Sequence, residues 1–225
     1  MRDPKRSVSL DAAVDLIGEK YVSRGGVKLE RALSAFQFSV DGHVMLDAGS
    51  STGGFTDCLL RHGARLVHAV ESGHNQLAYR LRVDNRVVAR EDTPIQTVGH
   101  LDPRPYAVVA DISFRSLRGV IAHMLSLTTA GVGIVLLKPQ FEWSDPPPEF
   151  DGVVRDTESL RSIVGNAIGG FANRGVVVGA GVESPIRGHG GNREFLLLVS
   201  SVGSRSSTDA DEITTALVER GEWHS

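Results

Sequence analysis

Residues 44–57 (VMLDAGSSTGGFTD) constrain the fold of this chain more than any other stretch. A short apolar run ends at Asp47 and leads into a turn rich in glycine and small residues. Apolar side chains then return at helical spacing, at Phe55, Leu59 and Leu60. In an open α/β sheet, ligands bind at the carboxyl ends of the strands, where such strand-to-helix turns lie. The stretch therefore predicts a Rossmann-like sheet with a ligand at its first turn.

The turn lacks the patterns that bind a pyrophosphate or a triphosphate. Position 51 is Ser, so the spacing is not G-x-G-x-x-G, and the turn contains no Lys-Ser or Lys-Thr pair for a P-loop. A nucleotide-like cofactor without a pyrophosphate fits better, and S-adenosylmethionine is the first candidate. The residues expected to bind it run from the acid to the start of the helix: Asp47, Gly49, Ser50, Ser51, Thr52, Gly53, Gly54, Phe55 and Thr56.

Two further strand ends support a cofactor over a tight connection without a ligand. Glu71 ends the second apolar strand, 22 residues after Gly49. An acid at this place in a Rossmann-type sheet binds the ribose hydroxyls of the ligand. The third strand leads to Asp92 and Thr93, at a strand end that commonly faces the adenine. We therefore add Glu71, Asp92 and Thr93 to the expected cofactor-binding residues.

Apolar runs and helical patterns alternate along the rest of the chain. This alternation predicts a doubly wound, mostly parallel sheet of seven strands, with helices on both faces and the last strand antiparallel. After the first strand, the expected strands are 66–70, 86–90, 106–111, 132–137, 175–181 and 195–199, and three of the expected helices are 74–82, 115–127 and 156–172. We expect an N-terminal extension over 1–20, one α/β domain over 21–202 and a C-terminal tail over 203–225.

Composition and charge restrict the function classes. No apolar run approaches the roughly 18 residues of a membrane span, and the N-terminus has no apolar signal core, so we expect a cytoplasmic protein without a membrane partner. The single cysteine, Cys58, allows neither an internal disulfide nor a cysteine-clustered metal site, and we expect no metal. The net charge of −3 argues against nucleic-acid binding by bulk electrostatics but permits a local basic patch. A homo-oligomer is compatible with this composition.

Three charged residues stand at unusual places. Asp111 ends the fourth strand, at the sheet edge that Gly49 and Glu71 share, so we expect it to bind the cofactor as well. Lys138 follows directly after six apolar strand residues. Lys28 falls near the start of a predicted helix, where the helix dipole disfavours a cation. Taken singly, either lysine is compatible with a surface position.

Five segments together resemble one family. They are 21–29 (YVSRGGVKL), 46–57 (LDAGSSTGGFTD), 111–114 (DISF), 138–142 (KPQFE) and 191–195 (GNREF). In this order, between about residues 20 and 200, they resemble the TlyA-type, FtsJ-like methyltransferases. The resemblance implies a class I fold, S-adenosylmethionine as methyl donor, and methylation of ribose 2′-hydroxyls in ribosomal RNA, with RNA or a ribosomal subunit as partner. It also implies a Lys-Asp-Lys-Glu tetrad on Lys28, Asp111, Lys138 and Glu194.

The chemistry of the implied reaction assigns roles to these residues. A ribose hydroxyl is a poor nucleophile and must be held in line with the methyl group while it loses its proton. Lys138 is the best candidate for the base, and the two carboxylates would orient the amines and balance their charge. Substrate contacts are expected from Ser23, Arg24, Phe114, Phe141 and Trp143.

The sequence departs from the family pattern in two places. Family members usually carry an S4-type RNA-binding domain before the Ser-Arg-Gly-Gly segment, whereas about 20 residues precede it here, so the resemblance covers the methyltransferase domain alone. A Gly-Lys-Gly-Gly segment that often follows the 138–142 motif is replaced by the acidic and apolar segment 143–150.

Two other hypotheses therefore stand beside RNA methylation. A small-molecule O- or N-methyltransferase of specialised metabolism would have an enclosed pocket roofed by residues 141–151, with Trp143 and Phe150 stacked on the substrate. RNA methylation instead predicts a positive surface around Lys28, Arg24 and Arg187. The third hypothesis is a cofactor-binding protein without catalysis.

Overall fold

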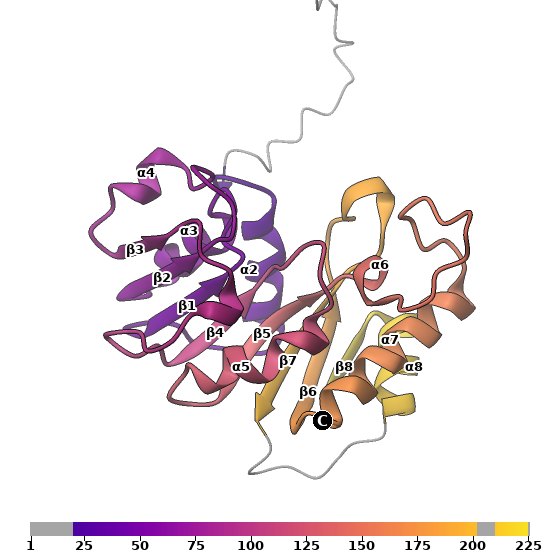
Figure 1. Cartoon of the computed structure of the whole chain (residues 1–225). Coiled ribbons are helices and arrows are strands. Elements are labelled where there is room, and N and C mark those ends of the chain that lie inside the picture. The colour runs from indigo at the N-terminus through magenta and orange to yellow at the C-terminus, as the bar shows by residue number, and fades with distance from the viewer. Residues whose placement is uncertain (1–19, 202–209, 225) are drawn as a thin grey trace, which may run out of the picture.

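The computed structural model of the chain describes residues 20–201 and 210–224. These residues form one mixed sheet flanked by helices (Figure 1). The strand order is β3-β2-β1-β4-β5-β7-β6-β8. The strands are β1 Val44–Ala48, β2 Leu66–Val70, β3 Val87–Arg90, β4 Ala107–Ala110, β5 Val132–Leu137, β6 Val176–Glu183, β7 Phe195–Ser201 and β8 Glu222–His224. The helices are α2 Gly25–Ala35, α3 Gly54–Arg61, α4 Tyr79–Arg82, α5 Ile121–Ser126, α6 Pro139–Glu142, α7 Thr157–Ala172 and α8 Ala210–Arg220, with short 3₁₀ turns η1 Ile95–Thr97, η2 Leu117–Gly119 and η3 His189–Gly191.

The direction of the strands places a crevice at one edge of the sheet. Strands β1 to β5 are mutually parallel, and β7 runs antiparallel to both β5 and β6. Strand β1 lies between β2 and β4, so the chain leaves β1 toward one edge of the sheet and later returns to its other side. A parallel sheet binds ligands outside the carboxyl ends of its strands at such a reversal. The predicted doubly wound sheet with an antiparallel seventh strand is confirmed.

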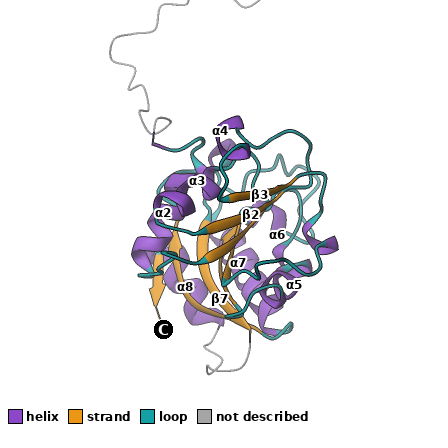
Figure 2. Cartoon of the chain, turned by 90° about the vertical axis from the view of Figure 1, so that its left-hand side faces the viewer, coloured by secondary structure: helices purple, strands orange, loops and turns teal. Residues whose placement is uncertain are grey.

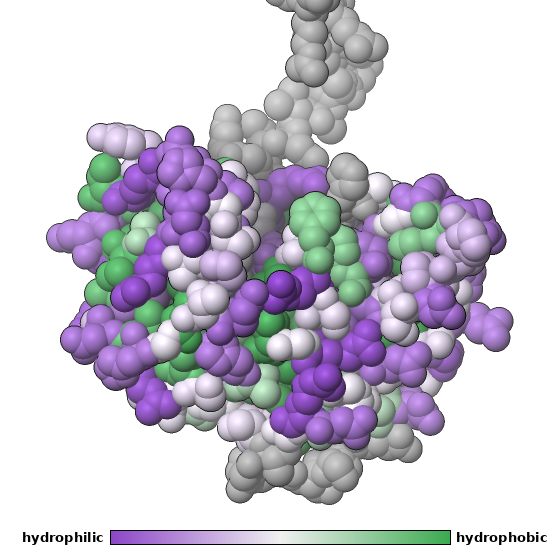
Figure 3. All heavy atoms as spheres, viewed as in Figure 1, coloured by the Kyte–Doolittle hydropathy of each residue, from purple (hydrophilic) through white to green (hydrophobic). Residues whose placement is uncertain are grey.

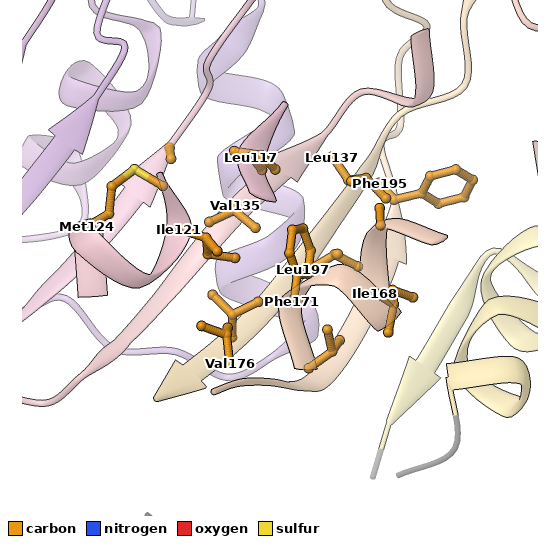
Figure 4. Close-up of a cluster of buried hydrophobic side chains, with 14 of the residues drawn as sticks. Leu117, Ile121, Met124, Val135, Leu137, Ile168, Phe171, Val176, Phe195 and Leu197 are labelled. Carbon is orange, nitrogen blue, oxygen red and sulfur yellow. The ribbon is translucent and has the colours of Figure 1, made fainter. Parts of the chain in front are cut away.

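The sheet buries side chains on both faces, and Figure 2 shows α2 and α3 on one side of it and α5 on the other. Strand β5 illustrates the alternation: Val135 and Leu137 pack into the core beneath α5 and α7, whereas Ile134 and Leu136 pack into the core beneath α2 and α3. Figure 4 shows the first of these cores, in which aliphatic and aromatic side chains from helices and strands interdigitate. A strand that is buried on both faces has a continuous run of apolar residues, and such runs allowed the strands to be predicted from the sequence.

The predicted count of seven strands is wrong, because the described residues form eight. Strand β8 pairs antiparallel with β6 through Gly181 and Trp223, and the Trp223 side chain is buried. Helix α8 contributes Ile213 and Leu217 to the core beneath α7. The segment 210–224 is thus part of the fold and not a separate tail. Its few apolar residues are separated by polar ones, so the sequence pattern did not predict this. The expected extension 1–20, apart from Lys20, and positions 202–209 and 225 lie outside the described residues.

Two predicted helices are shorter than expected. The helix predicted from residue 74 begins only at Tyr79, because the Glu91 carboxylate accepts hydrogen bonds from the backbone N–H groups of Gln76 and Leu77. The helix predicted over 115–127 is divided into η2 and α5. By contrast, α7 begins as predicted, with the Asp156 side chain accepting a hydrogen bond from the Ser159 N–H at 2.7 Å.

The helices of the described residues and the surface seen in Figure 3 bear on membrane association. Over residues 20–201 and 210–224, no helix has the length and apolar character needed to cross a bilayer. On the face seen in Figure 3, hydrophilic side chains predominate and hydrophobic ones form small separate patches. Cys58 is a free, buried thiol in α3, as expected.

Candidate active site

The first turn brings the ends of β1 and β4 into close contact. Gly49 has φ +80°, a conformation that side-chain-bearing residues rarely adopt. A Cβ at this position would lie 2.7 Å from the Asp111 carbonyl oxygen. A Cβ on Gly54 would lie 2.2 Å from Ser23 Oγ, so this glycine allows the start of α3 to pack directly against the segment that leads into α2. These two glycines let three segments that are distant in sequence meet at one place.

Asp47 lies fully buried beneath this turn. Its Oδ2 accepts a hydrogen bond from Thr56 Oγ1 at 2.6 Å, whereas Oδ1 has no hydrogen-bond partner among the described residues. Burial raises the pKa of the Asp47 carboxyl to about 7, against the opposing effect of the Thr56 hydrogen bond. A buried carboxylate oxygen without a partner fits a cofactor that brings a positively charged or hydrogen-bond-donating group to the turn.

Glu71 and Asp92, two further acidic residues expected to bind the cofactor, differ in their surroundings. Glu71 is buried, and its carboxylate accepts hydrogen bonds from the backbone N–H groups of Ser51 and Gly73 at 2.9 and 2.7 Å. Glu71 therefore fixes the Gly-rich turn against the end of β2, and its contact with a ribose stays a prediction. Asp92 is exposed and pairs with His74 Nδ1 at 2.8 Å.

Two pockets adjoin at Gly49 and together form a cleft along the carboxyl ends of the strands. The larger, about 380 Å³, is lined by the Gly-rich turn, the start of α2 and the Asp111 side of β4. The smaller, about 180 Å³, continues on the other side of Gly49 and includes Thr93, Ile112 and Ser113. An extended cleft with the predicted adenine-side residue Thr93 at one end and Lys28 at the other suits an elongated cofactor such as S-adenosylmethionine.

The four charged residues of the implied tetrad form two ion pairs at this cleft. Lys28 Nζ lies 2.5 Å from Glu194 Oε2, and Lys138 Nζ lies 2.5 Å from Asp111 Oδ1. Lys28 and Asp111 both line the larger pocket, so the two pairs face the same space. Lys28 reaches it from the first turn of α2, Asp111 follows β4, Lys138 follows β5, and Glu194 immediately precedes β7. Both lysine side chains are buried.

Aromatic side chains stand at the mouth of the cleft beside Lys138. Phe114 is 90% exposed and has φ +61°, an unusual conformation for a bulky residue. Its ring centroid lies 5.3 Å from that of Phe141, and the Lys138 ammonium lies 5.9 Å from the Phe141 ring. Ser23 and the exposed Arg24 line the cleft from the α2 side. A solvent-exposed aromatic ring at a cleft mouth is available to a large planar ligand.

Trp143 does not join this group. Its ring packs on Phe150 with centroids 4.9 Å apart, and both residues pack against the core beneath α7. Trp143 lines a different pocket, together with Asp145 and Asp156. The enclosed roof that a small-molecule substrate would need from residues 141–151 is therefore not formed by these two rings.

Three residues near the tetrad had no role in the sequence-based prediction. Ser113 Oγ accepts a hydrogen bond from Lys138 Nζ at 2.7 Å. Glu142 is buried and binds the start of η2, and burial raises the pKa of its carboxyl. Asn192 is buried and joins two loops. All three lie within the family-like segments, but their positions in those segments carry no signal of which partner each side chain meets.

Comparisons with known proteins show the family to which the chain belongs. A family model described as FtsJ-like methyltransferase matches residues 21–200. The chain belongs to the FtsJ-like methyltransferase family. It is 42% identical over 181 residues to Hemolysin A of Brachyspira hyodysenteriae, covering 79% of this chain and 75% of that protein. It is 38% identical over 214 residues to the Mycobacterium tuberculosis protein named 16S/23S rRNA (cytidine-2′-O)-methyltransferase TlyA, covering 90% of this chain and 78% of that protein.

A solved structure shares the fold of this chain. A protein named as a hemolysin from Lactococcus lactis superposes with a TM-score of 0.78 at 34% identity, over 89% of this chain and 99% of that chain. The FtsJ-like chain is thus an S-adenosylmethionine-dependent methyltransferase, and a cofactor-binding protein without catalysis is no longer a competing hypothesis. The Gly-rich turn, which lines the cleft, and the buried Asp47 oxygen, which has no hydrogen-bond partner among the described residues, fit this cofactor.

Proposed function

We propose that this FtsJ-like methyltransferase methylates a ribose 2′-hydroxyl of ribosomal RNA. The observation that carries the proposal is a set of two buried lysines, each paired with a carboxylate, in which one member of each pair lines the cleft beside the Gly-rich turn. The relatives named as ribosomal RNA methyltransferases support the same substrate class.

The residues divide the work of the reaction. S-adenosylmethionine supplies, when bound, a methyl group on a positively charged sulfur. Lys138 accepts the proton of the ribose hydroxyl, so that the oxygen attacks as its negative charge develops. Asp111 and Ser113 hold the Lys138 amine in place, since both contact its Nζ. Lys28 carries the second positive charge near the developing oxyanion, and Glu194 orients it.

The mouth of the cleft favours RNA over a small molecule. Phe114 presents an almost fully exposed ring beside Lys138, and Arg24 lies exposed on the opposite, α2 side of the cleft. Proteins bind unpaired bases by stacking on such rings and bind phosphates through such cations. A small-molecule enzyme would instead enclose its substrate, whereas Trp143 and Phe150 are packed on each other and on the core.

A partition experiment tests the substrate class. The enzyme is incubated with S-adenosylmethionine carrying a labelled methyl group and, separately, with ribosomal subunits and with a small-molecule extract of the same cells. We expect label in the ribosomal RNA, with a rate that falls steeply as salt rises, because phosphate contacts release counterions. Label confined to the small-molecule fraction would overturn the proposal in favour of the specialised-metabolism alternative.

A further inference from the structure

Two buried polar side chains outside the tetrad, Glu142 and Asn192, hydrogen-bond to loops close to its two ion pairs. Glu142 lies one helical turn beyond Lys138, and Asn192 lies two residues before Glu194. Both are nearly inaccessible to solvent, with 3% and 2% exposure. Neither belongs to the described residues that line the cleft on either side of Gly49. Glu142 instead lines the separate pocket that Trp143 lines, and the hydrogen bonds of both residues involve segments that carry members of the tetrad.

Glu142 ties the segment that carries Lys138 to the segment that carries Asp111. Its carboxylate accepts hydrogen bonds from Ser116 Oγ and the Leu117 N–H, both at 2.6 Å, and from Arg118 Nε at 3.2 Å. Arg118 Nη2 also donates to the Glu142 backbone oxygen at 2.9 Å. The chain from Asp111 to Leu117 is thereby held at both ends: Asp111 and Ser113 contact Lys138, and residues 116–118 contact Glu142.

Asn192 makes an equivalent connection close to the Lys28–Glu194 pair, between the loop before β7 and residues 152–154. Its Oδ1 accepts a hydrogen bond from the Val154 N–H at 2.9 Å, and its Nδ2 donates to the Gly152 oxygen at 2.8 Å. Its own backbone oxygen accepts from the Gly188 N–H at 2.9 Å. A Cβ on Gly188 would lie 2.1 Å from Glu194 Oε1, so the loop that Asn192 closes forms the wall against which the Glu194 carboxylate rests.

We propose that Glu142 and Asn192 are positioning residues, each holding one ion pair of the tetrad: Glu142 the Lys138–Asp111 pair and Asn192 the Lys28–Glu194 pair. The catalytic part of this inference rests on the proposed function. The physical reason is that a catalytic amine must be held within a fraction of an ångström, and exposed loops do not reach this precision unless buried hydrogen bonds fix them. Removing either side chain leaves buried polar groups without partners, so the loop that carries Asp111 or Glu194 shifts, and the lysine paired with that carboxylate follows.

The lysine content of the chain makes the two effects separable. There are four lysines, Lys5, Lys20, Lys28 and Lys138. In protein labelled with ¹³C-lysine, each Cε resonance reports the surroundings of one ammonium group. Glu142→Gln is expected to move the Lys138 resonance and leave that of Lys28 in place, and Asn192→Ala is expected to do the reverse. Each variant is thus the matched control for the other.

Kinetics supply the second readout. For both variants we expect kcat for methylation of ribosomal subunits to fall by roughly 10- to 100-fold, with the Kd for S-adenosylmethionine unchanged within about twofold. Milder variants cover the case in which folding fails: Ser116→Ala removes one donor to Glu142, and Asn192→Asp keeps the acceptor for Val154 but loses the donor to Gly152. Resonance shifts of both lysines together, or of neither, would overturn the inference. The resonance measurement needs no substrate, so a wild-type enzyme that fails to label RNA would count against the proposed function alone.

Discussion

The buried acid beneath the Gly-rich turn makes the stability of the enzyme depend on pH in a specific way. Burial moves the pKa of Asp47 from its ordinary value of 3.8 to about 7. Between these two values the folded state binds a proton that the unfolded state has lost, so stability falls as pH rises. The shift of about 3 pH units corresponds to roughly 4 kcal/mol, present as extra stability below pH 4 and lost above pH 7.

Asp47→Asn removes this dependence, because the amide does not ionise. The free energy of unfolding of both proteins is measured by urea denaturation from about pH 4 to 8 without cofactor. We expect the value for the variant minus the value for wild type to increase by about 4 kcal/mol as pH rises from about 4 to 7, and then to level off. Thr56→Val is the companion variant: it keeps the acid but removes the hydroxyl that favours its ionised form, so the fall in stability should extend to higher pH. A difference between Asp47→Asn and wild type that does not change with pH would refute the burial argument.

Two further predictions concern the cleft. Gly49→Ala places a side chain at a left-handed φ, with its Cβ only 2.7 Å from the Asp111 carbonyl oxygen. We expect the free energy of unfolding in urea to fall by about 1–3 kcal/mol and the affinity for S-adenosylmethionine, measured by calorimetry, to weaken. An unchanged affinity would mean that the turn does not hold the cofactor. Phe114→Ala should raise KM for ribosomal subunits by about 5- to 150-fold, the value of one base–aromatic stack. The melting temperature should not fall, because the ring is 90% exposed, and an unchanged KM would remove Phe114 from the RNA-binding surface.

The sequence predicted the parts of the fold that depend on local pattern. Strand β5 is a continuous apolar run because both faces are covered, and its end at Lys138 could be placed to the residue. The start of α7 was also predicted, since Asp156 and Thr157 are both N-cap residue types, and the structure shows that Asp156 is the cap. In each case the residues that decide the structure are neighbours in the chain.

Features that depend on contacts between distant segments were not predictable in the same way. The N–H groups of Gln76 and Leu77 are bound by Glu91, and this interaction removes one turn of a helix that the apolar spacing favours. Strand β8 owes its place to the burial of Trp223 beside Gly181, although the surrounding sequence is polar. Helical or strand periodicity carries no information about such partners.

The candidate site shows the same division. The family-like segments located Lys28, Asp111, Lys138 and Glu194, but nothing in the residues told which lysine pairs with which acid. The pairing Lys28–Glu194 joins residues 166 positions apart and follows from the antiparallel approach of β7 to β5. Likewise, Trp143 was expected at the substrate because it is an aromatic residue in a loop near the site, whereas the core and Phe150 provide its packing partners.

Lys138 is the proposed base for a ribose hydroxyl, and nucleoside analysis of the product combined with the rate of a Lys138 variant tests this directly. Ribosomal subunits are methylated with labelled S-adenosylmethionine, the RNA is digested to nucleosides, and the labelled nucleoside is identified by mass spectrometry. We predict a 2′-O-methyl nucleoside, a rate about 10²- to 10⁴-fold lower for Lys138→Ala, and a normal rate for Lys20→Ala, which removes an exposed lysine paired with Glu30. A methyl group found on a base, or a Lys138→Ala enzyme as fast as wild type, would contradict the account.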